Sequence, residues 1–511
     1  MKKTKIILVT ICMLIYGATF AQSKVFDNVV DIELRGSTEI VNNNQIVGYA
    51  LFYKIDKLKK SAMFKLSILD ENLKEIGTNE FEGPKDLLLT KAIYESERIF
   101  LSFYDEDKKD GYEKFVKVFD LKGKEKGTVP YEPEKVKKGM FGRAMADQND
   151  RIYEGATNVE GKGLLTSYQS KAKTGGVDVQ MIGLDGKLKW ESSITASKGD
   201  RTDMYLLGAT TNTILFFKME KGGVMSADGE IFLTGLDATT GKERFSKPLE
   251  IKGTAYEPMM LKKMNDGKLK IVSSMTDGGA KFYKAKPIGI SISDLNDITG
   301  ELKTVKDFSF QNELGSVMEM KNESKSEDGY IKAHDLCIMQ DGSMVIVGEF
   351  FRRTVSALGV ASKILGNGGQ SLAQGTVGDM FLLRIDNNLK PRSLEKIDKD
   401  KVRVQLPGET LSIGLLMKWL KYTGAFGYMY TDEGMDGKNK TVLAEGEFGD
   451  EKYGTVAITI NEKNGYSTKR FNLVKEKKVS YRIFRAKPGY VMVLKYNSKE
   501  KSLTSNLEKV N

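Results

Sequence analysis

Apolar runs and short polar turns alternate along the whole chain. Eight of the apolar runs end in Asp or Asn, usually directly after Leu or Ile, and a turn that usually carries Gly or Asn follows. The Asx side chain can accept hydrogen bonds from backbone amides two residues on, and Gly tolerates the positive φ of a tight turn. The eight Asx residues are Asp70, Asp120, Asp185, Asp237, Asn296, Asp386, Asn461 and Asn497.

Repetition on this scale predicts a repeat architecture, because one such unit cannot bury its own apolar face without stacking on its neighbours. Successive Asx residues lie 36 to 90 residues apart. Several of these intervals fit one four-stranded propeller blade of roughly 40–50 residues plus a longer loop. Four runs are continuously apolar, as strands buried on both faces are, and are predicted to be inner strands. They are Ile99–Tyr104, Ile214–Phe217, Met344–Val347 and Val491–Leu494.

The start of the chain beyond residue 21 predicts how the ring closes. Val30, Ile32 and Leu34 alternate with polar residues, which is typical of a half-buried strand. We expect residues 26–41 to supply the outer strand of the last blade by pairing with residues 480–510. Such pairing removes exposed sheet edges, which otherwise promote aggregation.

The fold that these patterns favour is all-β: a seven- or eight-bladed β-propeller over residues 22–511, with a short helical insertion at about 352–376. In that insertion Val355, Leu358 and Ala361 fall on one helical face, and the Gly-rich segment 366–369 ends it. The alternative is two β-rich domains that are split near residues 310–330, where a charged stretch has the composition of a linker.

Residues 1–21 have the pattern of a secretory signal peptide. Three lysines, at positions 2, 3 and 5, precede an apolar stretch from Ile6 to Phe20, and Ala21 offers a small residue at the cleavage site. No other segment is long and apolar enough to span a bilayer. We therefore expect an exported protein, periplasmic or extracellular, without a transmembrane span in the mature chain.

Charge and cysteine content narrow the possible partners. The net charge of +10 falls to +7 without the three signal lysines, and the charges are interspersed rather than gathered into a basic stripe. This pattern argues against a nucleic-acid partner. Of the two cysteines, Cys12 lies in the signal region, so Cys337 alone stays in the mature chain and no intramolecular disulfide can form.

The sequence assigns no catalytic, cofactor-binding or metal-ligating residue. His334 is the only histidine, so multi-histidine metal sites are excluded, and a hydrolase triad would have to use this residue. Cys337 lies three positions further along the same run, which in a regular strand places the two side chains on opposite faces. The cluster of Asp105, Asp107 and Asp110 misses the spacing of a calcium-binding loop and is interpreted as a solvated hairpin tip.

Residues Leu236–Glu243 (LDATTGKE) resemble the strand–turn–strand repeat of the pyrroloquinoline-quinone-like β-propellers. The resemblance implies a propeller, in a superfamily that includes quinone enzymes and outer-membrane assembly scaffolds without a cofactor. The tryptophan signature of that family is nearly absent, since only Trp190 follows a repeat turn and Trp419 lies elsewhere. This departure argues against a quinone, and no cofactor is assigned. The overall layout is also similar to uncharacterised secreted proteins of Bacteroidota.

The function that this evidence favours is that of an exported, non-catalytic β-propeller that binds a protein, a glycan or another component of the cell envelope. The reason is the poverty of catalytic side chains beside many loops. The alternative is a secreted polysaccharide hydrolase or lyase with paired carboxylates in the propeller channel. A quinone-dependent dehydrogenase is a third hypothesis. The propeller fold by itself does not choose among them.

Overall fold

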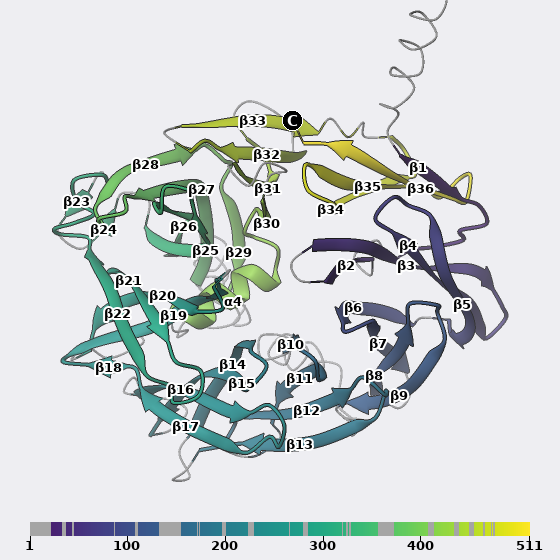
Figure 1. Cartoon of the computed structure of the whole chain (residues 1–511), viewed down its shortest axis with the longest axis horizontal. Helices are drawn as coiled ribbons and strands as arrows, with labels where there is room; N and C mark the ends of the chain where they lie inside the picture. Colours follow the sequence, from purple (N-terminus) through teal and green to yellow (C-terminus); the bar gives the residue numbers. More distant parts are fainter. Residues whose placement is uncertain are drawn as a thin grey trace, which may run out of the picture.

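The architecture is a ring of antiparallel sheets, seen in a computed structural model (Figure 1). The structure describes residues 22–32, 37–42, 45–85, 87–107, 111–131, 155–170, 172, 174–196, 201–222, 229–264, 266–278, 285–318, 320–322, 325–326, 329–355, 373–406, 413–433, 439–448, 454–462, 465–471, 473 and 476–510. The described strands form eight blades, so the prediction of a seven- or eight-bladed propeller is confirmed with eight. The alternative of two separate β-rich domains is wrong.

The first four blades follow one another in chain order, each with its strands in sequence order from the inside outward. Blade 1 consists of β2 (Thr38–Asn42), β3 (Gln45–Lys57), β4 (Ser61–Asp70) and β5 (Glu75–Pro84). Blade 2 consists of β6 (Leu88–Glu95), β7 (Arg98–Asp107), β8 (Gly111–Asp120) and β9 (Glu125–Tyr131). Blade 3 consists of β10 (Gly155–Val159), β11 (Gly163–Gln169), β12 (Val177–Gly183) and β13 (Leu188–Ile194). Blade 4 consists of β14 (Arg201–Ala209), β15 (Thr213–Lys221), β16 (Gly229–Asp237) and β17 (Glu243–Pro248).

The other four blades carry the irregular additions. Blade 5 consists of β18 (Glu250–Ile251), β19 (Thr254–Lys263), β20 (Leu269–Asp277), β21 (Pro287–Leu295) and β22 (Leu302–Ser309). A small hairpin follows, made of β23 (Met320–Asn322) and β24 (Lys325–Ser326). Blade 6 consists of β25 (Tyr330–Ile338), β26 (Met344–Val355), β27 (Ala373–Ile385), β28 (Pro391–Ile397) and β29 (Val402–Gln405), which pairs with β27. Blade 7 consists of β30 (Tyr428–Glu433), β31 (Lys440–Gly446), β32 (Gly454–Ile460) and β33 (Tyr466–Phe471), and blade 8 of β34 (Val479–Arg485), β35 (Tyr490–Asn497), β36 (Ser502–Lys509) and β1 (Ser23–Phe26).

The hydrophobic core lies between adjacent blades rather than at the centre of the ring. One cluster, for example, joins Phe52 and Phe64 of blade 1 to Leu101 and Phe103 of blade 2. The rings of Phe52 and Phe103 meet edge to face, with 5.2 Å between their centroids. Each blade therefore has two apolar faces, and its middle strands are covered on both sides.

This layering corrects the prediction about inner strands. Strands of neighbouring blades pack side by side around the axis: β2 contacts β6, and β19, the first long strand of blade 5, contacts β25. The four continuously apolar runs all lie in the second strands β7, β15, β26 and β35, not in the innermost ones. Seven of the eight innermost strands carry charged residues instead, and only β10 (GATNV) has none.

The ring closes through the start of the described chain. β1 pairs antiparallel with β36, with Phe26 opposite Leu503, and forms the outer strand of blade 8. The expected pairing with residues 480–510 thus occurs, but through Ser23–Phe26 rather than through 26–41. Val30 and Ile32 lie outside strands, and Leu34 lies outside the described residues. Thr38–Asn42 is the first strand of blade 1, because the chain turns inward to the axis after closing the ring.

Seven of the eight Asx residues lie in equivalent turns: between the third and fourth strands of blades 1 to 4, 6 and 7, and between β21 and β22, the last two strands of blade 5. The eighth, Asn497, lies between the second and third strands of blade 8. Blade 8 has no third-to-fourth turn, because its fourth strand comes from the other end of the chain. The predicted hydrogen bonds occur: the carboxylate of Asp70, for example, accepts the amide of Asn72 at 2.9 Å.

The only helix in the described residues is α4 (Ile413–Tyr422), between blades 6 and 7, which the sequence did not predict. The helical insertion expected at 352–376 begins and ends in strand, since 352–355 belong to β26 and 373–376 to β27. Residues 356–372 lie outside the described part of the chain. Figure 1 shows α4 on the inner side of the ring, close to β19 and β25. The helix contacts β19 and β27.

Candidate functional site

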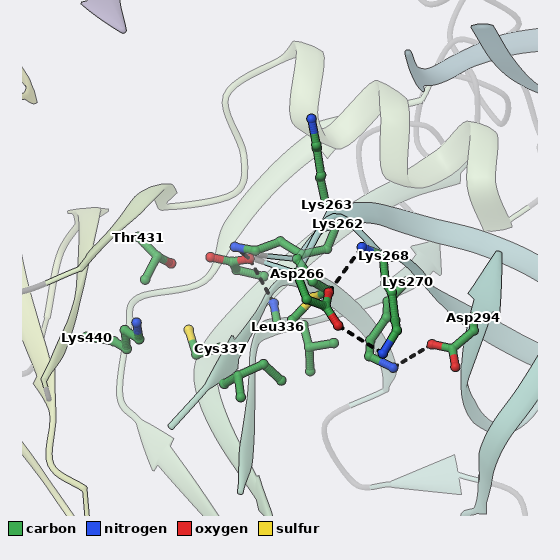
Figure 2. A pocket seen from close by; sticks show the side chains of 13 residues that line it. Lys262, Lys263, Asp266, Lys268, Lys270, Asp294, Leu336, Cys337, Thr431 and Lys440 are labelled. Atoms are coloured by element: carbon green, nitrogen blue, oxygen red, sulfur yellow. Dashed lines mark hydrogen bonds and ion pairs between the residues drawn. The ribbon is translucent and has the colours of Figure 1, made fainter. Parts of the chain in front are cut away.

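A pocket of about 400 Å³ opens where blades 5, 6 and 7 meet (Figure 2). Blade 5 contributes the β19–β20 hairpin, blade 6 the end of β25, and blade 7 the adjoining parts of β30 and β31. The lining residues are Lys262, Lys263, Met264, Asp266, Lys268, Lys270, Asp294, Asp335, Leu336, Cys337, Ile338, Thr431 and Lys440. The volume is within the range of small-molecule sites in proteins.

Charged pairs surround this pocket. Lys262 Nζ lies 2.6 Å from Asp335 Oδ1, and Lys270 Nζ lies 2.6 Å from Asp294 Oδ1. Lys268 pairs with Asp266 at 3.0 Å. Hydrogen bonds from Lys268 lower the pKa of the Asp266 carboxyl, which is therefore ionised at neutral pH. The rim thus presents both ammonium donors and carboxylate acceptors, five lysines against three aspartates.

The floor of the pocket is apolar. Leu336 and Cys337 are buried, and Ile338 is half-buried beside them. Figure 2 shows the Cys337 sulfur between the Thr431–Lys440 side of the pocket and the Lys270–Asp294 side. An apolar floor with polar groups at the rim is the usual composition of a site that binds an organic ligand.

The strand β25 has a bulge at His334, and this overturns one prediction. The pairing with β26 shifts between Ala333 and Asp335, so alternation is interrupted there. As a result Ala333 and Leu336, three residues apart, share the cluster that faces blade 5. The prediction that His334 and Cys337 lie on opposite faces is therefore wrong: Cys337 packs in the cluster that also holds Tyr428, and the His334 ring stacks on Tyr428 at 4.8 Å.

The imidazole of His334 is nevertheless held in a structural position. It meets Phe426 edge to face, and its Nε2 lies 3.3 Å from Oε1 of Glu349. Burial lowers the pKa of His334 to about 4 against the opposing effect of Glu349, so the ring is neutral at pH 7. A base of such low pKa is a poor general base at neutral pH.

Glu349 is the hub of a buried polar network. Its carboxylate pairs with the ammonium of Lys399 and accepts the backbone amides of Gly427, at 3.1 Å, and Tyr428, at 2.8 Å. Burial by itself raises the pKa of Glu349, but the hydrogen bond from His334 and the charge of Lys399 outweigh it and lower the pKa to about 2. The network ties β26 to the loop before β29 and to the start of β30.

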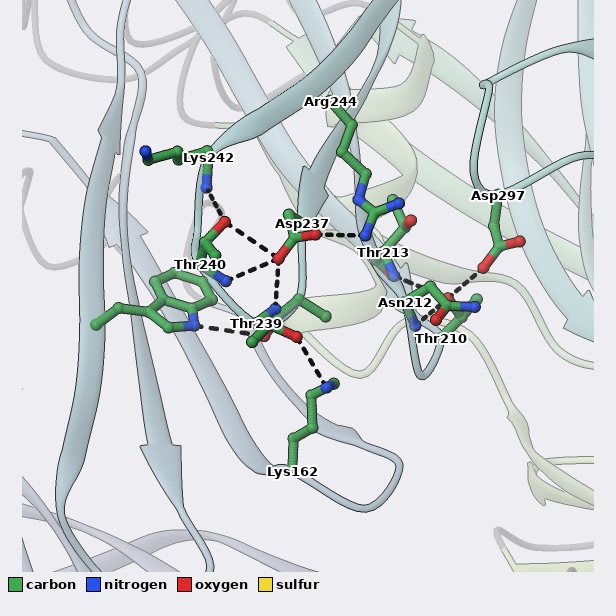
Figure 3. A network of polar contacts seen from close by, with 12 residues as sticks. Lys162, Thr210, Asn212, Thr213, Asp237, Thr239, Thr240, Lys242, Arg244 and Asp297 are labelled. Atoms are coloured by element: carbon green, nitrogen blue, oxygen red, sulfur yellow. Dashed lines mark hydrogen bonds and ion pairs between the residues drawn. The ribbon is translucent and has the colours of Figure 1, made fainter.

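A second polar network links the turns of blades 3, 4 and 5 (Figure 3). Lys162 of blade 3 donates to Thr239 Oγ1 of blade 4 at 2.9 Å, and Thr210 of blade 4 donates to Asp297 of blade 5 at 2.5 Å. Every side chain in these contacts has a partner from the neighbouring blade. We interpret this network as an inter-blade seam, and it leaves the pocket as the candidate binding site.

The sequence analysis named only one pocket residue, Cys337, and for a different reason. The signal that it left unused is the charge-rich hairpin Lys262–Lys270, in which lysines flank an Asp-Gly turn. From the sequence alone, this hairpin is interpreted as a solvated turn. Its role in a pocket follows only from the position of β25 and β30 beside it. No group of three His, Cys, Asp or Glu residues within the described ranges could hold a metal ion. Asp110 of the calcium interpretation lies outside those ranges.

The search for membrane-spanning helices found none that is long and apolar enough, within the part of the chain that the structure describes. A family model with the description "Family of unknown function (DUF6770)" matches residues 1–511. No curated protein matches the chain.

Solved structures with similar topology include several propellers. Prolyl oligopeptidase B from Galerina marginata matches with 8% identity and a TM-score of 0.40, over 94% of this chain and 56% of its own. This chain thus spans little more than half of the oligopeptidase. The WD40 domain of SCAP from fission yeast matches with 9% identity and a TM-score of 0.36, over 96% and 99% of the two chains. TolB from Acinetobacter baumannii matches with 11% identity and a TM-score of 0.25, over 81% and 80%. Similarity this low carries no functional argument.

Proposed function

This chain belongs to the DUF6770 family, a family of unknown function, and we propose that it is an exported, non-catalytic propeller that binds an envelope glycan in the pocket between blades 5, 6 and 7. The observation that carries the proposal is the composition of that pocket. The pocket has a volume of about 400 Å³, and paired ammonium and carboxylate groups surround its apolar floor.

A glycan suits this lining for two reasons. Sugar hydroxyls are uncharged and are both donors and acceptors. They can therefore accept a hydrogen bond from Lys262 or Lys270 and donate one to Asp335 or Asp294. The carbon-bound hydrogens of a pyranose ring form an apolar face, which complements a floor made of Leu336 and its neighbours. An ionic ligand of either sign would meet groups of its own charge at the rim.

The charged residues of the pocket support binding rather than catalysis. A glycosidase needs one protonated carboxyl group beside an ionised one at its working pH. Each pocket carboxylate pairs with a lysine, and hydrogen bonds from Lys268 lower the pKa of the Asp266 carboxyl. A raised carboxyl pKa does occur at Glu447, because the carboxylate of Asp400 hydrogen-bonds to it, but both are exposed and neither lines the pocket.

Export is proposed from residues 1–21 alone, whose pattern is that of a signal peptide. Cell fractionation of the full chain tests it: the expected product lies outside the cytoplasm and begins near Gln22. A cytoplasmic product that retains Met1 would contradict the proposal.

The binding proposal is tested on a chain that begins at residue 22. Defined probes are a peptidoglycan disaccharide, a neutral glucan hexamer and a hexauronate, each titrated by calorimetry and incubated for product analysis. We expect one of the first two to bind with a Kd in the micromolar-to-millimolar range and to stay intact. Measurable turnover of any probe would overturn the non-catalytic assignment, and failure of all three to bind would overturn the glycan assignment.

A variant pair locates the site. Ile338→Trp places a large ring in the pocket and is expected to weaken binding at least tenfold, without loss of the folded state. Leu188→Trp is the matched control, because Leu188 is 42% exposed on the outer strand of blade 3, and it should bind normally. Equal affinity of the two variants would exclude the pocket.

A further inference from the structure

Three lysines gather on the inner side of the ring, around α4. Lys418 and Lys421 belong to this helix, and Lys332 belongs to β25, the first strand of blade 6. The helix is held in place by its apolar face, with Leu416 and Leu420 fully buried. Its start is fixed to blade 5, where Oε1 of Glu257 accepts the backbone amide of Gly414 at 2.9 Å. The lysines are therefore presented by rigid elements.

These lysines have no carboxylate partner, in contrast to those of the pocket. The Lys332 ammonium donates to the backbone carbonyl of Met259. The Lys418 ammonium lies over the Tyr205 ring, 4.3 Å from its centroid. Among the described residues, no ion pair is formed by Lys332, Lys418 or Lys421. A neutral carbonyl and an aromatic face stabilise an ammonium group only in part.

The surroundings make the gathered charge costly. Burial, and then the charge of Lys421, lowers the pKa of Lys332 to about 7. Burial lowers the pKa of Lys418 to about 7 as well, with further repulsion from Lys421, Lys332 and Lys91. Lys421 itself is in contact with solvent, yet the protein around it lowers its pKa too. Lys418 and Lys421 are three residues apart on the helix and are therefore neighbours on its surface. A bound anion stabilises ammonium groups that repel one another.

We propose that Lys332, Lys418 and Lys421 form a binding site for an oxyanion with two or more negative charges, of the phosphate or carboxylate class. The site is water-accessible at Lys421 and half-open at the other two lysines, so a ligand can enter. Lysine rather than arginine at all three positions suits a compact, rotatable contact with a multiply charged group.

The anion site is distinct from the pocket, although β25 contributes residues to both. Lys332 lies three residues before Asp335 on β25, which is about 10 Å along a strand. The anion site therefore does not depend on the proposed glycan binding. Each site has variants that leave the other unaltered, so failure of one proposal does not decide the other.

Binding should depend on pH in a defined direction. The ionisable groups that face the site are Lys332 and His334 from β25, Lys418 and Lys421 from α4, Lys91 from β6, Tyr205 from β14 and Glu257 from β19. Lys332 and Lys418 lose their protons as the pH rises through about 7. The anion then loses its partners, so affinity falls above neutrality. His334 adds nothing there, because its pKa is about 4.

The test uses sulfate as the first probe, since its charge is constant over this range. Calorimetric titration of the chain from residue 22 at constant ionic strength should give binding at pH 6 that weakens at least tenfold by pH 8.5. Lys418→Met and Lys332→Met should each reduce the affinity at pH 6 at least tenfold. Lys499→Met is the matched control, because that lysine is exposed in the turn between β35 and β36 and belongs to neither site, and it should bind sulfate as the unaltered chain does.

The source of the anion is distinguished by two further probes, pyrophosphate and a trigalacturonate. Tighter binding of either one, lost in Lys418→Met, supports the site and names its class. Should Lys418→Met fail to fold, Lys421→Met at the solvent-exposed position replaces it. Absence of sulfate binding at pH 6, or equal affinity in Lys332→Met and Lys499→Met, would overturn the proposal.

Discussion

The carboxylate of Glu257 and the backbone amide of Gly414 form a buried hydrogen bond of 2.9 Å that joins blade 5 to the first turn of α4. Glu257 is 1% exposed, and an amide at a helix start has no partner within the helix. The bond satisfies a donor that would otherwise be buried without a partner, and it sets the position of the helix that carries Lys418. Helix placement and the proposed anion site are thus coupled through this one contact.

The same contact predicts the effect of a small substitution. In Gly414→Ala, the new Cβ would overlap the Glu257 carboxylate and lie 2.6 Å from the Tyr205 hydroxyl. Helix propensity alone would favour alanine by up to about 1 kcal/mol. We expect overpacking to dominate and to reduce the free energy of unfolding by about 1–3 kcal/mol in urea denaturation. Gly378→Ala, where a Cβ meets nothing within 4 Å, is the control, and a stabilised Gly414→Ala variant would refute this account.

A pair of glycines separates backbone strain from blade packing. Gly241, in the Asx turn of blade 4, and Gly161, in the first hairpin of blade 3, both have φ of +71°. A Cβ on Gly241 would overlap the ring of Trp190 in blade 3, whereas one on Gly161 meets nothing within 4 Å. Gly161→Ala should cost about 1–2 kcal/mol through strain alone. Gly241→Ala should cost about 1–3 kcal/mol more, because the seam between the blades must move; equal unfolding midpoints would exclude the packing contribution.

Ring closure predicts the effect of a short truncation. A chain that begins at residue 28 lacks β1, so it loses the ladder to β36 and the packing of Phe26 on Tyr53, whose centroids lie 5.9 Å apart. The exposed edge of β36 becomes a template for pairing between molecules. We expect a lower Tm and association that increases with protein concentration, measured by light scattering. A chain that begins at residue 22 is the control. A monomeric truncated chain with an unchanged Tm would show that closure adds no stability.

The pair of Glu349 and Lys399 predicts a non-additive double substitution. Lys399→Met leaves the fully buried Glu349 carboxylate without its cation, which should cost about 3–5 kcal/mol. Adding Glu349→Gln removes the buried charge while an amide oxygen still accepts the Gly427 or Tyr428 amide. The double variant should therefore recover most of the lost stability in a double-mutant cycle. Additive losses would argue that the two residues act independently.

Below about pH 6.5, where Lys332 and Lys418 are protonated in the folded and unfolded states alike, the stability of the chain should fall in two steps as the medium is acidified. The pKa of His334 is lowered from 6.5 to about 4 by burial, so the unfolded state binds the proton first, and stability is lost as the pH falls from about 6.5 through 4. The pKa of Glu349, lowered from 4.5 to about 2 in the folded state, extends the loss to lower pH. Urea midpoints between pH 8 and 3 measure both. His334→Gln should flatten the first step alone, and an unchanged slope in that variant would contradict this assignment.

Much of the ring could be predicted from the sequence, because the residues that form each turn are close together in the chain. An Asx residue, the amide two positions on and a residue of positive φ lie within one turn, so Asp120 and Gly123 define their turn without help from the rest of the fold. The apolar runs likewise predicted strands that are covered on both faces. Whether such a strand is the first or the second of its blade could not be predicted. A second strand that is buried between two neighbouring blades has the same apolar sequence that is expected of a strand next to the axis.

The two candidate sites could not be predicted from the sequence, because their residues come from segments that are distant in the chain. Lys262, Asp335 and Lys440 come from three blades, and each alone reads as an ordinary charged position. The bulge at His334 reversed the faces of the residues that follow it, although nothing in the residue pattern of β25 marks a bulge. The helix α4 carries two lysines whose meaning depends on Lys332, which lies about ninety residues earlier in the chain.

By itself, then, the amino-acid order determined that this protein is a repeat of antiparallel strands with Asx turns, since turn chemistry and two-residue alternation act over a few neighbours. Only the tertiary structure decided the number of blades, the strand that closes the ring, and the gathering of Lys332, Lys418 and Lys421 at its axis. Those features depend on which segments distant in sequence come together, and burial and charge repulsion act through space rather than along the chain.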